Sequence, residues 1–280
     1  MTLLQILILA IVQGAAELLP VSSSAHVIVA EKLMGLDPTS PQMTLLLVML
    51  HTGTMFAVIA YFWKSWHATY FASLTAFRTQ ALRLVVATAM TGAVGLALLQ
   101  LIKRVATRGA DGFEIEHLFG NARLMATALA AAGLLIIVSA RQRESAGDLS
   151  LRAAAWIGAV QGLCLPFRGF SRSGATISTG LVLGIARRRA EEFSFALAVV
   201  LTPAVIAREA HRLWRAEGAL HAPDAASLWG LAGPSVIGMA LSFLAGLAAL
   251  RWLSRWLEQG RWHLFGAYCL FAAVVVLLVG

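Results

Sequence analysis

The sequence predicts an all-α polytopic membrane protein, in which six transmembrane helices and two re-entrant helical hairpins form an inverted-topology repeat. Three observations support this fold class: an apolar composition, six long apolar segments, and two polar stretches that resemble each other. Of the 280 residues, 59% are hydrophobic and 13% are charged, and the mean hydropathy is +0.77. Soluble domains carry about 25% charged residues, so the composition favours a membrane protein.

The first polar stretch follows the apolar N-terminus and reads VQGAAELLPVSSSAH over Val12–His26. The apolar run before it is similar to part of a signal peptide, but it lacks a basic n-region and a usual small-residue cleavage site. We therefore interpret it as part of the mature protein. Gly14 and Pro20 are expected to interrupt a helix within this stretch.

Six other segments approach the ~20 residues that span a bilayer. The one that begins at Glu192 is the shortest. The six segments are Met43–Trp63, Leu84–Ile102, Leu124–Ala140, Glu192–Ala207, Leu231–Leu250 and His263–Val279.

The second polar stretch, VQGLCLPFRGFSRSGAT over Val160–Thr176, aligns with the first. Gln161 matches Gln13 and Ser171–Ser173 match Ser22–Ser24, with one extra residue between them. Three crossings follow each stretch, so residues 1–140 and 141–280 would insert with opposite orientation, as inverted repeats do. Irregular backbone at membrane depth survives only inside protein or beside water. Both stretches, the second interrupted by Gly162, Pro166 and Gly169, are therefore predicted to be re-entrant hairpins.

Basic residues predict the orientation in the membrane. Eight lie on the side of the N-terminus and twelve on the opposite side, with Arg168 and Arg172 inside the second hairpin. The side richer in Lys and Arg faces the cytoplasm, so both termini should lie outside. Because the basic residues cluster at the ends of apolar runs, the pI of about 10.5 requires no nucleic-acid partner, and we expect none.

Glu17 is the first candidate for function, since a charged side chain at membrane depth costs about 2.5–3.5 kcal/mol on insertion scales. The alternative is a glutamate that caps a broken helix or pairs with an arginine. Arg172, from the other half, is the expected partner. With Ser171, Ser173 and Gly174 beside it, Arg172 offers a planar donor fork and helix N-terminal amides, which suit phosphate oxygens.

Ser22–Ser24 are candidates for a nucleophile. Serines in membrane helices usually bond their own backbone or a neighbouring helix, but a hydroxyl nucleophile needs a base and an electrophile held in line. His26 or Glu17 would be the base, and Arg172 would hold the electrophile. His51, in the first crossing, is either a helix–helix hydrogen-bonding residue or a further member of the site.

With these residues in place, the sequence resembles the undecaprenyl-pyrophosphate phosphatases of the bacitracin-resistance type, which are polytopic enzymes of the bacterial inner membrane. That family is marked by Glu/Gln-x-x-x-Glu running into Pro-Val-Ser-Ser-x-x-His, which stands here between Gln13 and His26. A second mark, Pro-Gly-x-Ser-Arg-Ser-Gly, survives as Ser171–Gly174. The resemblance extends along the whole chain.

The resemblance implies removal of the terminal phosphate from a polyprenyl pyrophosphate lipid, at a site open to the periplasm, so that the carrier lipid returns to cell-wall synthesis. It also implies a divalent cation, Mg²⁺ or Ca²⁺, held partly by Glu17, and a possible homodimer. The implied catalytic residues are Glu17, Ser23, His26 and Arg172. The expected substrate-binding residues are Gln13, Ser22, Ser24, Ser171, Ser173, Gly174 and Arg168.

Two features depart from the family pattern. Gln13 removes one metal-ligand charge, and Arg168 belongs to a lead-in that is one residue longer, which puts the exact lipid in doubt. Two other functions stay open. A transporter would use the same anion site to carry a polyprenyl phosphate across the bilayer, but it needs no pair such as Ser23 and His26. A non-catalytic lipid-binding or scaffold protein would explain the fold but not this group of polar residues.

Overall fold

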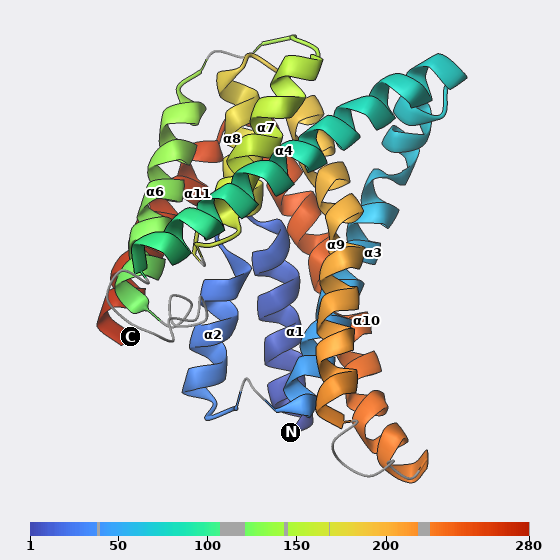
Figure 1. The fold of residues 1–280 in the computed structure, drawn as a ribbon, viewed down its shortest axis with the longest axis vertical. Helices are drawn as coiled ribbons and strands as arrows, with labels where there is room; N and C mark the ends of the chain where they lie inside the picture. The colour runs from blue at the N-terminus through green and yellow to red at the C-terminus, as the bar shows by residue number, and fades with distance from the viewer. Residues whose placement is uncertain (38–39, 107–120, 143–144, 168, 218–224, 280) are drawn as a thin grey trace.

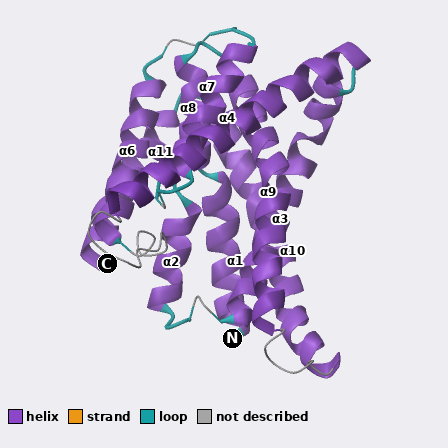
Figure 2. Cartoon of the chain, in the orientation of Figure 1, coloured by secondary structure: helices purple, strands orange, loops and turns teal. Residues whose placement is uncertain are grey.

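The computed structural model describes residues 1–37, 40–106, 121–142, 145–167, 169–217 and 225–279 (Figure 1). Within these ranges the regular structure is helical, as Figure 2 shows, and the predicted all-α class is confirmed. The helices are α1 (Leu3–Leu18), α2 (Ser23–Leu33), α3 (Pro41–Tyr70), α4 (Leu74–Ala106), α6 (Ala122–Ala140), α7 (Leu151–Cys164), α8 (Arg172–Val182), α9 (Arg187–Glu217), α10 (Ala225–Glu258) and α11 (Trp262–Val279).

Each of the six segments predicted to cross a membrane lies within one helix: α3, α4, α6, α9, α10 or α11. Among the described residues, α3, α4, α6 and α10 contain stretches long and apolar enough to span a bilayer, and α11 is a shorter apolar helix. The helix α9 is 31 residues long, but charged residues at both ends reduce its apolar character. Large apolar side chains such as Leu96, Leu134 and Phe271 are exposed. The chain is therefore a helical protein with several membrane-type helices.

Both polar stretches form a helix, a turn and a second helix, as expected. In Figure 1, α1 and α2 extend from the end of the molecule that carries the N-terminus, while α7 and α8 lie toward the opposite end. Pro20 lies in the first turn, and Pro166 and Gly169 lie in the second. Both turns reach the interior, where they face each other.

The expectation that Gly14 and Gly162 interrupt the hairpin helices is wrong. Both lie inside helices, where the missing side chain permits close packing. A Cβ atom on Gly14 would lie 2.7 Å from the Cβ of Ala245 in α10, and one on Gly162 would lie 2.8 Å from the carbonyl oxygen of Thr91 in α4. These glycines allow the first helix of each hairpin to contact a long helix from the other half of the chain.

The helices of the two halves alternate in space. The first half contributes α1, which packs on α10, and α4, which packs on α7; in addition α3 packs on α9 and α6 on α11. The interior between them is apolar, and includes the fully buried Leu50, Leu129, Ile157 and Leu250. This packing fixes the position of both hairpin turns.

Candidate active site

The turns of the two hairpins border one cavity with about 270 Å³ of space. Glu17 and Ser22–Ser24 line it from the first hairpin, and Ser171–Ser173 line it from the second. Residues of α3 and α9 complete the wall, among them His51 and Thr202. The structure thus brings the main polar residues of both stretches to one place.

Glu17, in the last turn of α1, is the centre of the polar contacts. The Ser23 hydroxyl donates a hydrogen bond to its Oε2 atom at 2.5 Å. The Gln13 amide donates to the same oxygen at 3.3 Å, from one helical turn earlier. On the other side, the Nη2 atom of Arg172 donates to Oε1 at 3.2 Å. The predicted contact between Glu17 and Arg172 is therefore present, and it joins the two halves.

Arg172 is the first residue of α8 and offers an unused donor. Its Nη1 atom is buried and has no hydrogen-bond partner within the described part of the chain. A buried donor without a partner is costly, so Arg172, which lines the cavity, retains the capacity to donate to a further acceptor. A guanidinium with one nitrogen on a carboxylate and another free suits a phosphate oxygen.

Two helices begin at this cavity. The first, α2, starts at Ser23 and the second, α8, starts at Arg172. Helix N-termini carry partial positive charge and outward-facing N–H groups, which favour anions. Together with the Arg172 guanidinium, they favour a phosphate at the point where the turns meet.

The two turns also contact each other directly. Ser173 donates from its hydroxyl to the carbonyl oxygen of Leu19 at 3.3 Å. Gly174 lies against Pro20, since an added Cβ would be 3.2 Å from the proline Cβ, and its amide donates to the Ser171 hydroxyl at 3.2 Å. Gly174 therefore contributes to the contact between hairpins rather than to the cavity wall. Ser171 caps α8, while Ser22 and Ser24 share a hydroxyl contact of 3.3 Å.

His26 is hydrogen-bonded to other groups than the Ser23 hydroxyl. Its Nδ1 atom is 2.8 Å from the carbonyl oxygen of Ser22, and its Nε2 atom is 2.7 Å from the hydroxyl of Tyr268 in α11. Of the two bases that the sequence suggests for Ser23, Glu17 is the one in contact. Arg168, the remaining predicted substrate-binding residue, lies outside the described residues.

Three further residues lie near the site, although the sequence assigned none of them a definite role in it. His51 places its Nε2 atom 3.8 Å from the Oε2 atom of Glu17, while its Nδ1 atom bonds the Leu47 carbonyl at 2.8 Å. Its membrane position was a signal, but it fitted two interpretations. Gln161 lines the cavity and bonds Thr91 at 3.2 Å. Tyr268 lies in FGAYCLF, a segment near the end of the chain that belongs to the family resemblance, but it was assigned no role because it is remote in sequence from both polar stretches.

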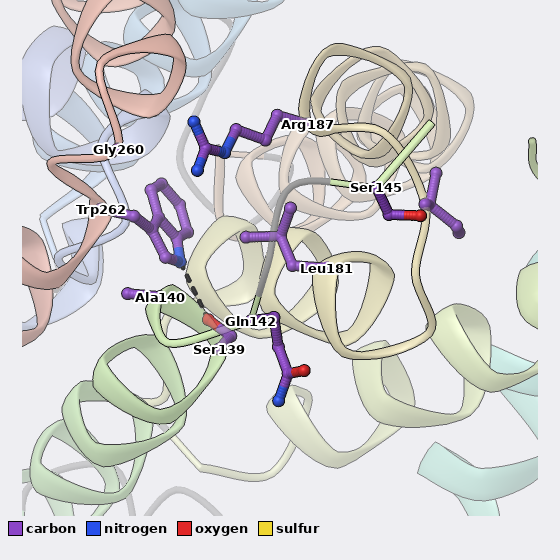
Figure 3. Close-up of a pocket in the computed structure, with 9 residues that line it drawn as sticks. Ser139, Ala140, Gln142, Ser145, Leu181, Arg187, Gly260 and Trp262 are labelled. Atoms are coloured by element: carbon purple, nitrogen blue, oxygen red, sulfur yellow. Dashed lines mark hydrogen bonds between the residues drawn. The ribbon is translucent and has the colours of Figure 1, made fainter. Parts of the chain in front are cut away.

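Two further cavities lie elsewhere. The one drawn in Figure 3 offers about 20 Å³, which is room for a single water. Beside it, the Trp262 indole donates to the Ser139 hydroxyl at 3.1 Å, so its polar groups serve helix packing. The other cavity lies beside Tyr70, Arg83 and Glu192. None of the predicted site residues lines either cavity.

Comparison with known proteins gives consistent matches along the chain. The family model described as Bacitracin resistance protein BacA matches residues 6–275. A protein of Acinetobacter baylyi named undecaprenyl-diphosphatase 2 is 64% identical, over 99% of this chain and 98% of that protein. An undecaprenyl-diphosphatase of Desulfosudis oleivorans is 35% identical, over 99% of this chain and 98% of the relative. One of Acidiphilium cryptum is 33% identical, over 100% of this chain and 99% of the relative.

The family pattern and the structure agree on the residues that meet in space. The Glu17 segment and the Ser171–Gly174 segment, which are 155 residues apart at Glu17 and Arg172, form one polar site. The matches leave few residues at either end uncovered. The chain belongs to the BacA family of bacitracin resistance proteins.

Proposed function

We propose that this chain hydrolyses undecaprenyl pyrophosphate to undecaprenyl phosphate and inorganic phosphate. The names of its relatives support this activity. The observation that carries the proposal is the contact of Ser23 with Glu17, whose other oxygen pairs with Arg172. A nucleophile, its base and an anion-binding group thus lie within one cavity, as phosphoryl transfer requires.

In the proposed mechanism, Arg172 and the N-termini of α2 and α8 hold the terminal phosphate. The Ser23 oxygen attacks its phosphorus while the hydroxyl proton passes to Glu17. The bond from that phosphorus to the bridging oxygen breaks, and undecaprenyl phosphate leaves with the proton from Glu17. Water then gives a proton to Glu17, attacks the phosphoserine, and releases phosphate as the Ser23 oxygen regains a proton.

A divalent cation, Mg²⁺ or Ca²⁺, is part of the proposal. The described residues contain no group of three or more His, Cys, Asp or Glu side chains arranged to hold a metal. Mg²⁺ is commonly bound through one or two carboxylates together with substrate phosphates, and Glu17 in the cavity fits that mode. When bound, the cation would neutralise phosphate charge. Chelation should lower phosphate release, and added Mg²⁺ or Ca²⁺ should restore it.

For the membrane arrangement, we propose six crossings (α3, α4, α6, α9, α10 and α11) and two re-entrant hairpins. Residues 1–140 and 141–280 would be the inverted repeats. The reciprocal packing of α1 on α10 and α7 on α4 supports this relation, because an axis that exchanges the halves exchanges those pairs. The distribution of basic residues supports outward-facing termini.

We place the protein in the bacterial inner membrane, with the cavity opening to the periplasm and the prenyl tail among the apolar helices. Labelling of single cysteines from the periplasmic side tests this orientation. A cysteine at Thr2 should react in intact cells and one at Arg255 should not. The homodimer remains a prediction, to be measured by mass determination in detergent.

Phosphate release by the purified protein, in detergent and without a membrane gradient, tests the activity. Glu17→Gln should reduce turnover by about 10³-fold, within the range known for loss of a general base. Ser23→Ala should reduce it at least as much, because it removes the nucleophile itself. Ser73→Ala, an exposed hydroxyl far from the cavity, is the matched control and should leave turnover unchanged. Trapping of a phosphoserine in rapid acid quench would support direct attack by Ser23.

The same variants separate hydrolysis from transport. A transporter needs the anion site but not the hydroxyl, so Ser23→Ala would still move a polyprenyl phosphate between the leaflets of a vesicle. Wild-type protein that moves this lipid but releases no phosphate would overturn the proposal in favour of transport.

A further inference from the structure

We infer that Tyr268 is a positioning residue of this site, which acts through His26 on the turn that presents Ser23. The inference rests on the proposed function for its kinetic tests, but its geometry is independent of the reaction. It concerns a chain of contacts that runs from α11 through the His26 ring to the backbone of Ser22.

The turn before Ser23 has an unusual backbone conformation. Ser22 has φ 68° and ψ 96°, and it is the one non-glycine residue with positive φ in the described ranges. Side chains disfavour this region, and such strain persists only where the surroundings hold it. Ser22 is also the N-cap of α2, yet its side chain makes no capping hydrogen bond. The conformation therefore needs support from elsewhere.

His26 supplies that support. Its Nδ1 atom lies 2.8 Å from the Ser22 carbonyl oxygen, whereas the backbone amide of His26 is 3.5 Å from the same oxygen. The ring thus adds a second, shorter hydrogen bond to the oxygen that accepts the long first backbone bond of α2. A carbonyl oxygen only accepts hydrogen bonds, so Nδ1 carries the proton. His26 thereby fixes the carbonyl immediately before the Ser23 amide.

Tyr268 fixes the ring. In neutral histidine with the proton on Nδ1, the Nε2 atom accepts, so the Tyr268 hydroxyl donates to it at 2.7 Å across 242 residues. The two rings are also stacked, with centroids 5.6 Å apart and an interplanar angle of 16°. Tyr268 does not line the cavity. The Ser22 carbonyl oxygen therefore sets the tautomer of His26, and the Tyr268 phenol holds the orientation of its ring, in the way outer partners orient functional histidines.

This arrangement gives His26 a role different from that of a base. Both of its ring nitrogens are occupied, by Ser22 and Tyr268, and Glu17 is the group in contact with Ser23. What the site requires from His26 is a donor at the Nδ1 position. An asparagine amide nitrogen occupies a similar place, whereas alanine offers no donor.

The first test compares variants of His26. His26→Asn should retain turnover within about 10-fold of the wild type, while His26→Ala should lose at least about 10-fold more, because the Ser22 carbonyl oxygen loses the shorter of its two hydrogen bonds. An asparagine cannot act as a base at neutral pH. Equal and severe loss in both variants would overturn the inference and assign His26 to proton transfer.

The second test removes the phenol hydroxyl. Tyr268→Phe should lower kcat by about 3- to 10-fold with KM unchanged, since one hydrogen bond outside the substrate site is lost. Tyr61→Phe, on α3 and away from the cavity, is the matched control and should have no effect. In a His26→Ala background, Tyr268→Phe should cause no further loss, because the two residues act in series. Independent, multiplicative effects would contradict the inference.

A third measurement needs no activity. In protein with ¹⁵N-labelled histidines, the signal that disappears in His26→Asn identifies His26. The ¹⁵N chemical shifts of its ring should show a proton on Nδ1. Tyr268→Phe should move the Nε2 chemical shift toward the value of an unprotonated ring nitrogen that accepts no hydrogen bond. A proton on Nε2 in the wild type would overturn the inference. Absence of phosphate release from wild-type protein would instead overturn the proposed function and leave this result standing.

Discussion

The two hairpins have similar sequences, but their second helices begin in different ways. Ser171 caps α8 in extended conformation, with φ −65° and its hydroxyl accepting from the Gly174 amide. The aligned Ser22 begins α2 with φ 68° and no side-chain cap. The hairpin that carries the guanidinium is relaxed, and the hairpin that carries the hydroxyl is strained. The strained backbone thus lies directly before Ser23, the residue that the proposed mechanism presents to the phosphorus atom.

The aligned positions also differ in chemistry. Ser23 and Arg172 are equivalent in the alignment, and each is the first residue of its helix. His26 aligns with Ala175, so the relaxed hairpin lacks the histidine that the strained one uses. One position in two related stretches thus provides a hydroxyl on one side and a guanidinium on the other.

Among the changes that compare the two hairpins, the largest expected effect comes from altering the guanidinium. Arg172→Lys should lower kcat/KM by about 10²-fold, because an ammonium keeps the charge but loses the planar pair of donors. Phosphate release in detergent measures it, with Arg251→Lys on an exposed part of α10 as the matched control. Near-normal turnover in Arg172→Lys would show that charge alone suffices and would remove the need for the free Nη1 donor.

The next effect tests whether the hairpins are equivalent in packing. Gly14→Ala and Gly162→Ala should each lower the free energy of unfolding by about 1–3 kcal/mol, since the new Cβ meets atoms at 2.7 and 2.8 Å. Gly92→Ala is the matched control, because no atom lies within 4 Å of its Cβ and alanine favours a helix. Thermal unfolding in detergent measures all three. A neutral result at Gly14 would mean that α1 moves away from α10 without cost.

A smaller effect tests the different helix starts. Ser171→Ala should destabilise by about 1 kcal/mol, because α8 loses its cap. Ser22→Gly should be neutral or stabilising by less than about 1 kcal/mol, since glycine accepts positive φ. Thermal unfolding again reports both changes. Equal destabilisation in the two variants would contradict the distinction between a relaxed and a strained turn.

The smallest effect concerns the cation. Gln13→Glu would place a second carboxylate beside that of Glu17, in the position where the Gln13 amide now bonds the Glu17 Oε2 atom. The cation concentration for half-maximal phosphate release should fall several-fold, because a second negative ligand favours a divalent ion. Titration of Mg²⁺ and Ca²⁺ into chelated protein measures it. An unchanged midpoint would place the cation on the phosphate alone.

Much of the fold followed from polarity and helix breakers. The membrane-type segments were predictable because a helix that spans lipid needs a long run of consecutive apolar residues. The turns at Pro20 and Pro166 were predictable because proline ends helices. Helix ends were less predictable. The segment expected from Leu84 begins at Leu74 in the structure, because a helix continues beyond the apolar part that the pattern detects.

The pairing of Glu17 with Arg172 was predictable, because a buried charge requires a partner of opposite charge. A carboxylate at membrane depth needs a cation, and the repeat offered Arg172. The position of His26 was not predictable, because its bonds depend on Tyr268 in the last helix. Gly14 was misread because a glycine in a polar stretch suggests a break, whereas a contact with α10 required it. Long-range packing decided both cases.

The equivalence of Ser23 and Arg172 has a consequence for the separate halves. Two identical copies of one half, assembled head to tail, would present either two hydroxyls or two guanidinium groups to a bound ligand. Neither set provides an attacking atom together with a group that holds its target. In the proposed mechanism the two copies therefore carry different groups, and neither half is expected to release phosphate when expressed alone.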